Sequence, residues 1–296
     1  MGGAFSPAHP APPAPARNAV LQAEEHAGEG QRRNKIEDAM NLTTLACRVS
    51  VLALLTLTPA YAQWEGYPTP GIPRTPNGQV NLNAPLPRTP NGKPDLSGLW
   101  QANRGAFNFA VGLKRGETVP FTAEGKQLFD ERQANNSKDE PSARCLPSHV
   151  AMRNQLNTPF KFFQLPGVTI QLYESRSTFR QIFTDGRPLP KIEWPTWAGY
   201  SVGKWEGDTF VVETTGFNGK TWLDQAGHSA TDAMRLTERF TRKDFGHMEL
   251  ETIVNDPKVY TKPWSTVAQF TFKADTELLE FICEENERDS QFLIGK

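Results

Sequence analysis

Alternating apolar and polar residues recur in short stretches from residue 96 onward, which predicts β-strands with two distinct faces. In residues 168–174, for example, Val168, Ile170 and Leu172 share one face of the strand. Ten strands are expected in this way, at residues 98–102, 160–165, 168–174, 178–184, 198–206, 209–217, 234–242, 247–255, 266–273 and 278–284.

The connections between these strands are short and turn-like, as at Pro166-Gly167 and Asp185-Gly186. One helix is expected near residues 122–134, capped by Thr122, and residues 135–158 resemble a long loop. A single open sheet of ten strands would leave its edges bare. We therefore expect an all-β fold, an antiparallel meander closed into a barrel of about ten strands with one short helix.

Residues 40–62 have the three parts of a secretory signal peptide. A short segment ending at Arg48 is followed by an apolar run at residues 49–57, and Ala60-Tyr61-Ala62 supplies small residues for cleavage. The run is shorter than the ~20 residues that span a bilayer, so no membrane span is expected. We predict cleavage near Ala62 and a periplasmic or secreted protein.

Two further N-terminal segments differ from the strand-rich part. Residues 1–39 lack apolar periodicity and are interpreted as a non-structural extension, or as a mis-called start before Met40. Residues 63–95 form an arm rich in Pro and Gly that contains the hexapeptide PRTPNG twice. We expect this arm to lie along the surface of a barrel domain at residues 96–296, although a binding arm is an alternative.

Charge and aromatic content narrow the choice of partners. The chain has 32 basic and 33 acidic residues, so charge does not indicate nucleic acid or an anionic membrane surface. All seven Trp lie after residue 62. Such an aromatic-rich domain is compatible with a small-molecule ligand or substrate.

The three cysteines support the prediction of export. Cys47 lies inside the signal peptide, so cleavage leaves Cys145 and Cys283. An even number of cysteines in an oxidising compartment predicts a Cys145–Cys283 disulfide, with two buried thiols as the alternative.

Glu238 is the most informative candidate for chemistry, because the sequence contains no established catalytic motif. Alternation places Glu238 between Leu236 and Phe240 on one strand face. An inward-facing Glu238 would be a candidate general acid or base. Since buried charges need partners, the alternative is an internal ion pair with Arg180, another residue within a predicted strand.

His228 is the second candidate, in a loop four residues after Asp224. The two could form an oriented base, or His228 could simply be solvated. A metal site built from His149, His228 and His247 lacks ligand spacing, so neither a metal nor another cofactor is expected.

Four aromatic residues are candidates for ligand binding, namely Trp197, Tyr200, Trp205 and Trp222. They could stack on a ring of the ligand or form barrel core and rim. Alternation places Tyr200 and Trp205 on opposite faces of one strand, so these two cannot line the same cavity.

Two resemblances bear on the fold. Gly98-Leu99-Trp100 resembles the G-x-W start of lipocalin-type barrels, in which the Trp plugs the closed end, and this resemblance implies a lipocalin-like barrel. A longer series of blocks is similar to a family of exported hypothetical bacterial proteins. These blocks are PRTPNGKPDLSGLW, TPFKFFQLPG, FRQIFTDGRPLP, WAGYSVGKWEGDTFVVETTGFN, TWLDQAGH, LTERFTRKDFGHMELE and DPKVYTKPW. The family resemblance implies export and a shared fold, and no reaction. Ala230 stands where that family has a second His.

Three functions are compatible with these observations. The leading hypothesis is an exported protein that binds a small apolar or aromatic molecule in the barrel. The alternative is a cofactor-independent lyase, isomerase or hydrolase with Glu238, His228 and Arg180 in one cavity. The third is an envelope structural or interaction module that uses the Pro-rich arm.

Overall fold

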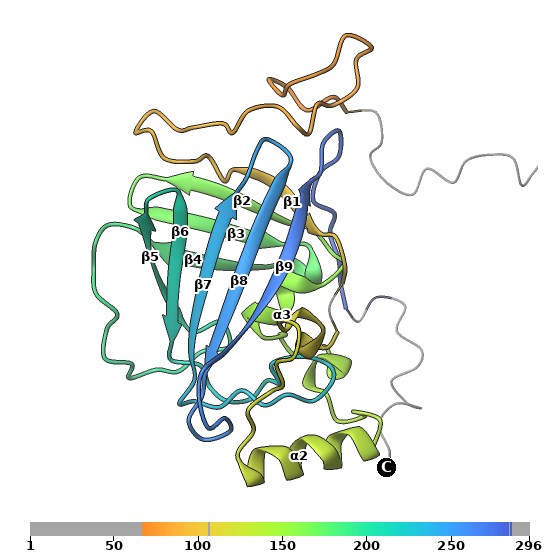
Figure 1. Ribbon diagram of the computed structural model, residues 1–296, viewed down its shortest axis with the longest axis vertical. Helices are drawn as coiled ribbons and strands as arrows, with labels where there is room; N and C mark the ends of the chain where they lie inside the picture. The colour runs from red at the N-terminus through yellow and green to blue at the C-terminus, as the bar shows by residue number, and fades with distance from the viewer. Residues whose placement is uncertain (1–66, 106, 284, 286–296) are drawn as a thin grey trace, which may run out of the picture. The chain divides into compact units, whose positions relative to one another are not determined.

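A closed β-barrel dominates the computed structural model, which describes residues 67–105, 107–283 and 285 (Figure 1). The chain divides into two units, residues 1–62 and 63–296, and the described residues all lie in the second. The expected signal peptide and cleavage site therefore lie outside the described residues. The nine strands, adjacent in sequence order around the barrel, are β1 (Gly98–Ala102), β2 (Phe160–Leu165), β3 (Val168–Tyr173), β4 (Thr178–Phe183), β5 (Tyr200–Glu206), β6 (Thr209–Thr215), β7 (Arg235–Arg242), β8 (His247–Asn255) and β9 (Trp264–Phe272).

The described residues also form two α-helices and three short 3-10 helices. They are η1 (Phe109–Gly112), α2 (Ala123–Ala134), η2 (Pro141–Arg144), α3 (Val150–Gln155) and η3 (Ser175–Ser177). The Thr122 side chain caps α2 by accepting a hydrogen bond from the Gly125 N–H at 3.0 Å, as predicted. No helix among the described residues has the length and apolar character needed to cross a bilayer.

The predicted closed, all-β barrel is confirmed, with two differences in detail. β4 and β5 pair in parallel at Ile182↔Ser201 and Phe183↔Val202, so the sheet is not a purely antiparallel meander. The expected strand at residues 278–284 does not form in its described part. Because β9 pairs with β1 to close the barrel, no free edge is left there for a tenth strand.

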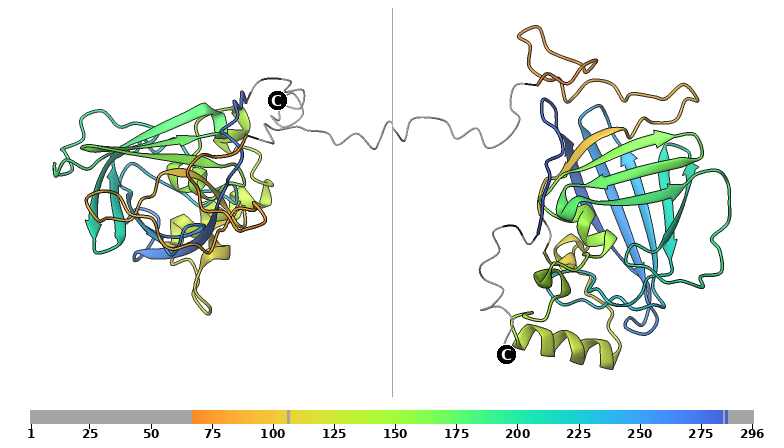
Figure 2. Two further views of the ribbon diagram at one scale, coloured as in Figure 1. Left: turned by 90° about the horizontal axis from the view of Figure 1, so that it is seen from above. Right: turned by 180° about the vertical axis from the view of Figure 1, so that it is seen from behind.

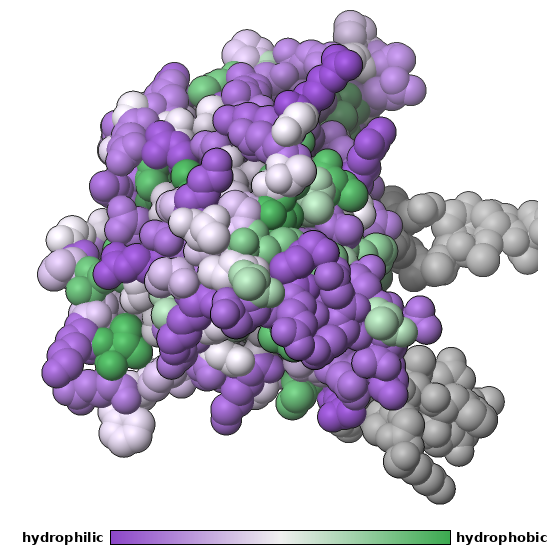
Figure 3. Space-filling view, turned by 60° about the horizontal axis from the view of Figure 1, so that its bottom comes forward, coloured by the Kyte–Doolittle hydropathy of each residue, from purple (hydrophilic) through white to green (hydrophobic). Residues whose placement is uncertain are grey.

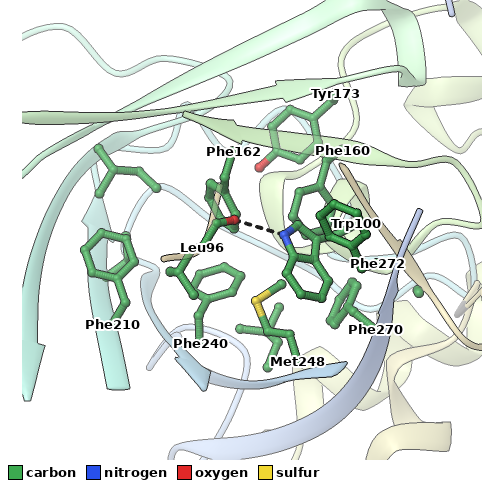
Figure 4. Packing of buried hydrophobic residues seen from close by; sticks show 14 of the residues in the cluster. Leu96, Trp100, Phe160, Phe162, Tyr173, Phe210, Phe240, Met248, Phe270 and Phe272 are labelled. Atoms are coloured by element: carbon green, nitrogen blue, oxygen red, sulfur yellow. Dashed lines mark hydrogen bonds between the residues drawn. The ribbon is translucent and has the colours of Figure 1, made fainter. Parts of the chain in front are cut away.

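Aromatic side chains fill the barrel interior near one end (Figure 4). Trp100 is fully buried, and its Nε1–H donates to the Leu96 carbonyl oxygen at 2.9 Å. The Arg242 guanidinium lies 4.8 Å from the centre of the Trp100 ring, where the cation contacts the aromatic face. Other rings packed in this cluster are those of Phe160, Phe162, Phe210, Phe240, Phe270 and Phe272.

The described part of the arm covers this end of the barrel, whereas α2 lies beyond the opposite end (Figures 1 and 2). The carbonyl oxygens of Leu82 and Ala84 accept hydrogen bonds from the backbone N–H groups of Gly246 and Phe245, at 2.7 and 2.9 Å. The Leu82 side chain also packs against the aromatic cluster. The arm therefore forms part of the closed end.

The two PRTPNG repeats fold into matching turns. In each, the Thr N–H bonds to the carbonyl oxygen four residues later, and the Gly N–H bonds back to the Thr carbonyl oxygen. Each turn directs its Arg to a carboxylate: Arg74 lies 2.5 Å from Asp275, in the segment after β9, and Arg88 lies 2.6 Å from Asp208, in the turn between β5 and β6. The repeat thus forms two similar attachments between the arm and the barrel.

Replacement of Gly246 by alanine should loosen the arm. A Cβ atom at this position would lie 2.5 Å from the Leu82 Cβ and 2.7 Å from the Leu82 carbonyl oxygen, so the arm backbone must move. We expect a loss of about 1–3 kcal/mol in the free energy of unfolding, as for other overpacked sites. Limited trypsin digestion followed by mass spectrometry should detect faster cleavage after Arg74 and Arg88.

Lys243→Ala, in the same β7–β8 connection, is the control for this change. Lys243 makes an exposed contact of 3.5 Å with Glu249, so its removal should leave arm cleavage unchanged. Equal cleavage rates in Gly246→Ala and the unsubstituted protein would contradict the described packing of Leu82.

The helix α3 is inserted at the end of the barrel opposite the arm. All six of its residues are buried, although this region was expected to be a loop. Val150 and Ala151 pack in a second apolar cluster with residues from the ends of β7, β8 and β9. The predicted Cys145–Cys283 disulfide is present and links the segment before α3 to the segment that follows β9.

Candidate functional site

A polar layer crosses the barrel interior between the two apolar clusters. It begins on β3, which turns its polar face inward, so that Thr169, Gln171 and Tyr173 are buried. The apolar face of the strand, with Ile170 and Leu172, points outward and is partly exposed. This polarity is the reverse of an ordinary barrel strand and supplies hydrogen-bonding groups to the interior.

An ion pair between Arg180 on β4 and Glu238 on β7 lies at the centre of this layer. Arg180 Nη2 lies 2.6 Å from Glu238 Oε2, and both side chains are almost completely buried. Arg180 Nε donates to Ser201 Oγ at 2.9 Å, and Nη2 also donates to Thr214 Oγ1 at 2.6 Å. Of the two interpretations of Glu238, the structure therefore contains the internal ion pair.

The helix α3 contributes to the same network through Asn154. Asn154 Nδ2 donates to the second carboxylate oxygen of Glu238, and Asn154 Oδ1 accepts from Gln171 Nε2 at 2.7 Å. The Tyr173 hydroxyl also donates to Asn154 Oδ1, at 3.0 Å. Burial raises the pKa of Tyr173 to about 12, so this hydroxyl remains a neutral donor. The polar layer thus joins strands β3, β4 and β7 to α3.

Several buried polar atoms of this layer have no hydrogen-bond partner within the described residues. Thr252 on β8 lies between Glu238 on β7 and Thr266 on β9. Neither the Thr252 hydroxyl nor the Thr266 hydroxyl has a partner among these residues. Arg180 Nη1, His149 Nε2 and Arg153 Nε are also unpaired. Buried polar groups are normally satisfied, so such a concentration is unusual.

His149 and Arg153, at the start and middle of α3, bring further polarity to the interior. His149 Nδ1 accepts a hydrogen bond from the Ala151 N–H at 3.2 Å and caps the helix. Burial, reinforced by the nearby charges of Arg153 and Arg180, lowers the pKa of His149 to about 3. The ring is therefore neutral, and because Nδ1 accepts, its proton lies on Nε2.

His149 should make the fold sensitive to acid. Its pKa is about 3 in the folded protein and about 6.5 in an unfolded chain, so the unfolded chain binds an additional proton between these values. The free energy of unfolding should therefore fall as pH falls, by about 3 kcal/mol between pH 6.5 and 4 from this group. Urea unfolding across this pH range measures the loss.

His149→Asn is the matched variant, because asparagine also caps helices but does not titrate. The free energy of unfolding of this variant should decline less steeply below pH 6.5. The difference in slope against pH should correspond to about one proton fewer taken up on unfolding. Identical slopes for the variant and the unsubstituted protein would show that His149 is protonated in the folded state, contrary to its enclosed position.

His228 and Asp224 form a second buried pair. His228 Nδ1 lies 2.6 Å from Asp224 Oδ2, and neither side chain is exposed. The carboxylate also accepts from the backbone N–H groups of Phe109 and His228, at 2.7 and 3.0 Å. The His228 ring packs against Phe121 and Phe129, so it is not the solvated loop histidine that was considered as the alternative.

These two buried pairs do not share one site. Glu238 lies two residues from Leu236 along β7, on the same face of the strand. Leu236 pairs with Val254 on β8, which pairs with Trp264 on β9, so these three apolar residues form the next row across the sheet. The Trp264 ring in turn contacts His228, with 5.8 Å between ring centres. The structure thus brings Arg180 to Glu238 and His228 to Asp224, and places an apolar row between the pairs.

The four candidate aromatic residues also fail to assemble into one surface. Tyr200 points outward and stacks on Phe183, whereas Trp205 packs beside the barrel core. Trp222 borders a separate groove of about 340 Å³, which is also lined by Ala230. Trp197 is partly buried in the loop before β5. No common aromatic wall is formed by these side chains.

Five surface pockets among the described residues do not reach the polar layer. The largest of the five pockets described has a volume of about 450 Å³ and is bordered by Pro120, Lys262 and Trp264. None of the five is lined by Arg180 or Glu238.

Within the described residues, no three His, Cys, Asp or Glu side chains gather as metal ligands. Around the α2 end, hydrophobic residues are scattered among hydrophilic ones (Figure 3).

No protein-family model, curated protein or solved structure matches this chain. The geometry of the polar layer is therefore the basis for assigning a function.

Proposed function

We propose that the chain is an exported protein that binds a small molecule in the polar layer of its barrel. The observation that supports this proposal is the set of buried polar atoms beside the Arg180–Glu238 ion pair that have no partner among the described residues. A layer used only for stability would be expected to satisfy its own donors and acceptors. A ligand with polar atoms could supply the missing partners.

The surroundings of the layer favour a ligand whose body is apolar or aromatic. One apolar cluster, containing Trp100 and Phe240, lies toward the arm, and another, containing Phe217 and Leu236, lies toward α3. The His149 ring, at the edge of the layer, is 4.5 Å from the Phe217 ring, measured between centres. A mainly apolar molecule with one polar group would match this sequence of environments.

Entry to the layer would require movement of the segment that carries α3. This helix has only six residues, and its Asn154 makes the contact that closes the network around Glu238. The helix is not part of the closed strand ladder, so its displacement would leave the pairing of the strands intact. We propose that α3 is displaced while the ligand enters and then covers it.

Export is part of the same proposal. The disulfide between Cys145 and Cys283 is typical of proteins that fold in an oxidising compartment. The apolar run before Ala60-Tyr61-Ala62 would direct the chain there. The intact mass of the secreted protein tests this part, because export with cleavage should yield a chain that begins at Gln63. A mature chain that retains residues 40–62 would contradict it.

Native mass spectrometry of the protein purified from the periplasm tests the binding function. We expect an additional mass that remains under native conditions and is released on denaturation. The double variant R180M/E238L, in which the polar layer becomes apolar, should not retain this mass. A protein that carries no small molecule, even after incubation with an extract of its own cells, would overturn the proposal.

The control for this experiment is an ion pair of the same type on the barrel exterior. Arg239 and Glu206 are 3.0 Å apart and partly exposed, so R239M/E206L alters the same residue types outside the interior. This variant should retain the additional mass. Its loss from both double variants would indicate a general effect on folding.

The alternative function, cofactor-independent catalysis, is favoured by one observation. His228 is oriented by Asp224, and its Nε2 atom has no partner within the described residues, which is the arrangement of a general base. Diethyl pyrocarbonate modification tests whether this nitrogen can be reached. The partly exposed His247 serves as the internal standard. Modification of His247 without His228 would argue against catalysis by His228.

A further inference from the structure

The charged groups buried around α3 are not balanced within the described residues. Arg180 is matched by Glu238, and Arg176 lies in the field of Glu140. Arg153 is only 3% exposed and forms no ion pair within the described part of the chain. A guanidinium that is removed from water without a counter-charge is strongly unfavourable, so Arg153 would be stabilised by an added negative charge.

The contacts that Arg153 does make leave its charge uncompensated. Arg153 Nη1 donates to the neutral Thr178 hydroxyl at 2.9 Å, and the guanidinium lies 4.9 Å from the centre of the Tyr173 ring. Its Nε atom has no partner among the described residues. Glu238 is already engaged by Arg180 and Asn154. Arg153 therefore retains an unpaired donor and an unbalanced charge.

Three of the nitrogen atoms without a partner among the described residues are donors on α3 or on its polar neighbours. Arg153 Nε and Arg180 Nη1 carry N–H groups of cations, and His149 Nε2 carries the ring proton because Nδ1 is an acceptor. His149 and Arg153 are one turn apart on α3, and Asn154 of the same helix donates to Glu238, the ion-pair partner of Arg180, so the three side chains belong to one region of the interior. Two of these donors belong to cations, so an anion would match them both in charge and as a hydrogen-bond acceptor.

We propose that the ligand carries a single carboxylate, which binds between Arg153, Arg180 and His149, with its apolar body toward Phe217. This inference rests on the proposed binding function and identifies the chemical class of the ligand. One excess positive charge matches a monoanion better than a phosphate dianion. A carboxylate also presents two oxygens to planar guanidinium groups, which suits arginine.

Binding measurements with matched acids and neutral analogues test this inference. The protein comprising residues 63–296 is titrated by calorimetry with benzoate, 4-phenylbutyrate and decanoate, and with the corresponding primary amides. Inorganic phosphate is titrated in parallel, as a small anion without an apolar body. We expect at least one acid to bind at least tenfold more tightly than its amide, and phosphate to bind more weakly than that acid.

Substitutions of Arg153 then locate the carboxylate. Arg153→Met removes the unbalanced charge at similar volume and should weaken acid binding at least tenfold while leaving amide binding unchanged. Arg153→Lys retains the charge without the Nε donor, so an intermediate affinity is expected. Arg144→Met, in the segment before α3, removes an exposed arginine that pairs with Asp139 and should have no effect.

The outcomes separate this inference from the binding function. Equal affinities for acids and amides would overturn the carboxylate site but leave a small-molecule binder. Preference for phosphate over every acid would overturn the assignment of an apolar monoanion. Absence of binding by the whole series would also overturn the inference, whereas retained mass in the native spectra decides the binding function independently.

Discussion

Replacement of Glu238 by leucine is expected to lower the free energy of unfolding by about 3–5 kcal/mol. Arg180 would then hold its charge in the barrel interior with only hydroxyl partners, since Ser201 and Thr214 are its other contacts. Asn154 would also lose the acceptor of its Nδ2 group. Urea unfolding followed by circular dichroism measures the change.

The double variant R180M/E238L distinguishes the ion pair from simple packing. Replacing a buried pair by apolar residues of similar volume is often neutral, so most of the loss should be recovered. Arg180→Met completes the double-mutant cycle, and the coupling between the two positions should be large and favourable. A Glu238→Leu protein as stable as the original would mean that Arg180 reaches solvent in the folded state.

Removal of the disulfide is the second substitution with a large expected effect. Cys145 and Cys283 are 138 residues apart in sequence, so their bond restricts most of the unfolded barrel chain. Replacing both by serine should lower the free energy of unfolding by up to about 4–5 kcal/mol in the chain-entropy description. Urea unfolding under non-reducing conditions measures this loss.

A reducing agent provides the control for the disulfide. It should destabilise the unsubstituted protein toward the stability of C145S/C283S and should leave that variant unchanged. Near-equal stability of the oxidised protein and the variant would show that the bond adds little constraint. An intact mass that retains both thiol hydrogens would instead show that the bond is not formed in the purified protein.

Much of the barrel could be predicted from local patterns. Strands at residues 98–102, 160–165 and 247–255 were expected with the bounds that the structure has, because alternation and turn residues act within a few positions. Closure followed from the need to avoid free edges. The parallel pairing of β4 with β5 had no local signal, because strand direction depends on the path of residues 184–199.

The orientation of β3 shows why the site was harder to predict than the fold. Alternation separates Ile170 from Gln171, but it does not say which face is inside. Gln171 faces inward because α3 presents Asn154 to it, and α3 comes from a different part of the chain. A helix of six residues has less than two turns, so it leaves no recognisable apolar period in the sequence.

The partners of the charged residues were only partly predictable. The Arg180–Glu238 pair followed from the rule that a buried charge needs a partner, and the structure contains it. His228 and Asp224 were associated by their close spacing in one loop. Arg153 was not recognised, because a single arginine in a presumed loop is ordinarily solvated. Its importance depends on the burial of α3, which is a tertiary property.

The two matching PRTPNG turns have a consequence for how the arm can detach. With Arg74 and Arg88 each held at a separate barrel carboxylate, the arm is a bivalent ligand of its own barrel. When one turn is released, the other keeps it at a high effective concentration, so rebinding is fast. Since Leu82 and Ala84 also bond to the barrel, loss of either arginine should leave the end of the barrel covered.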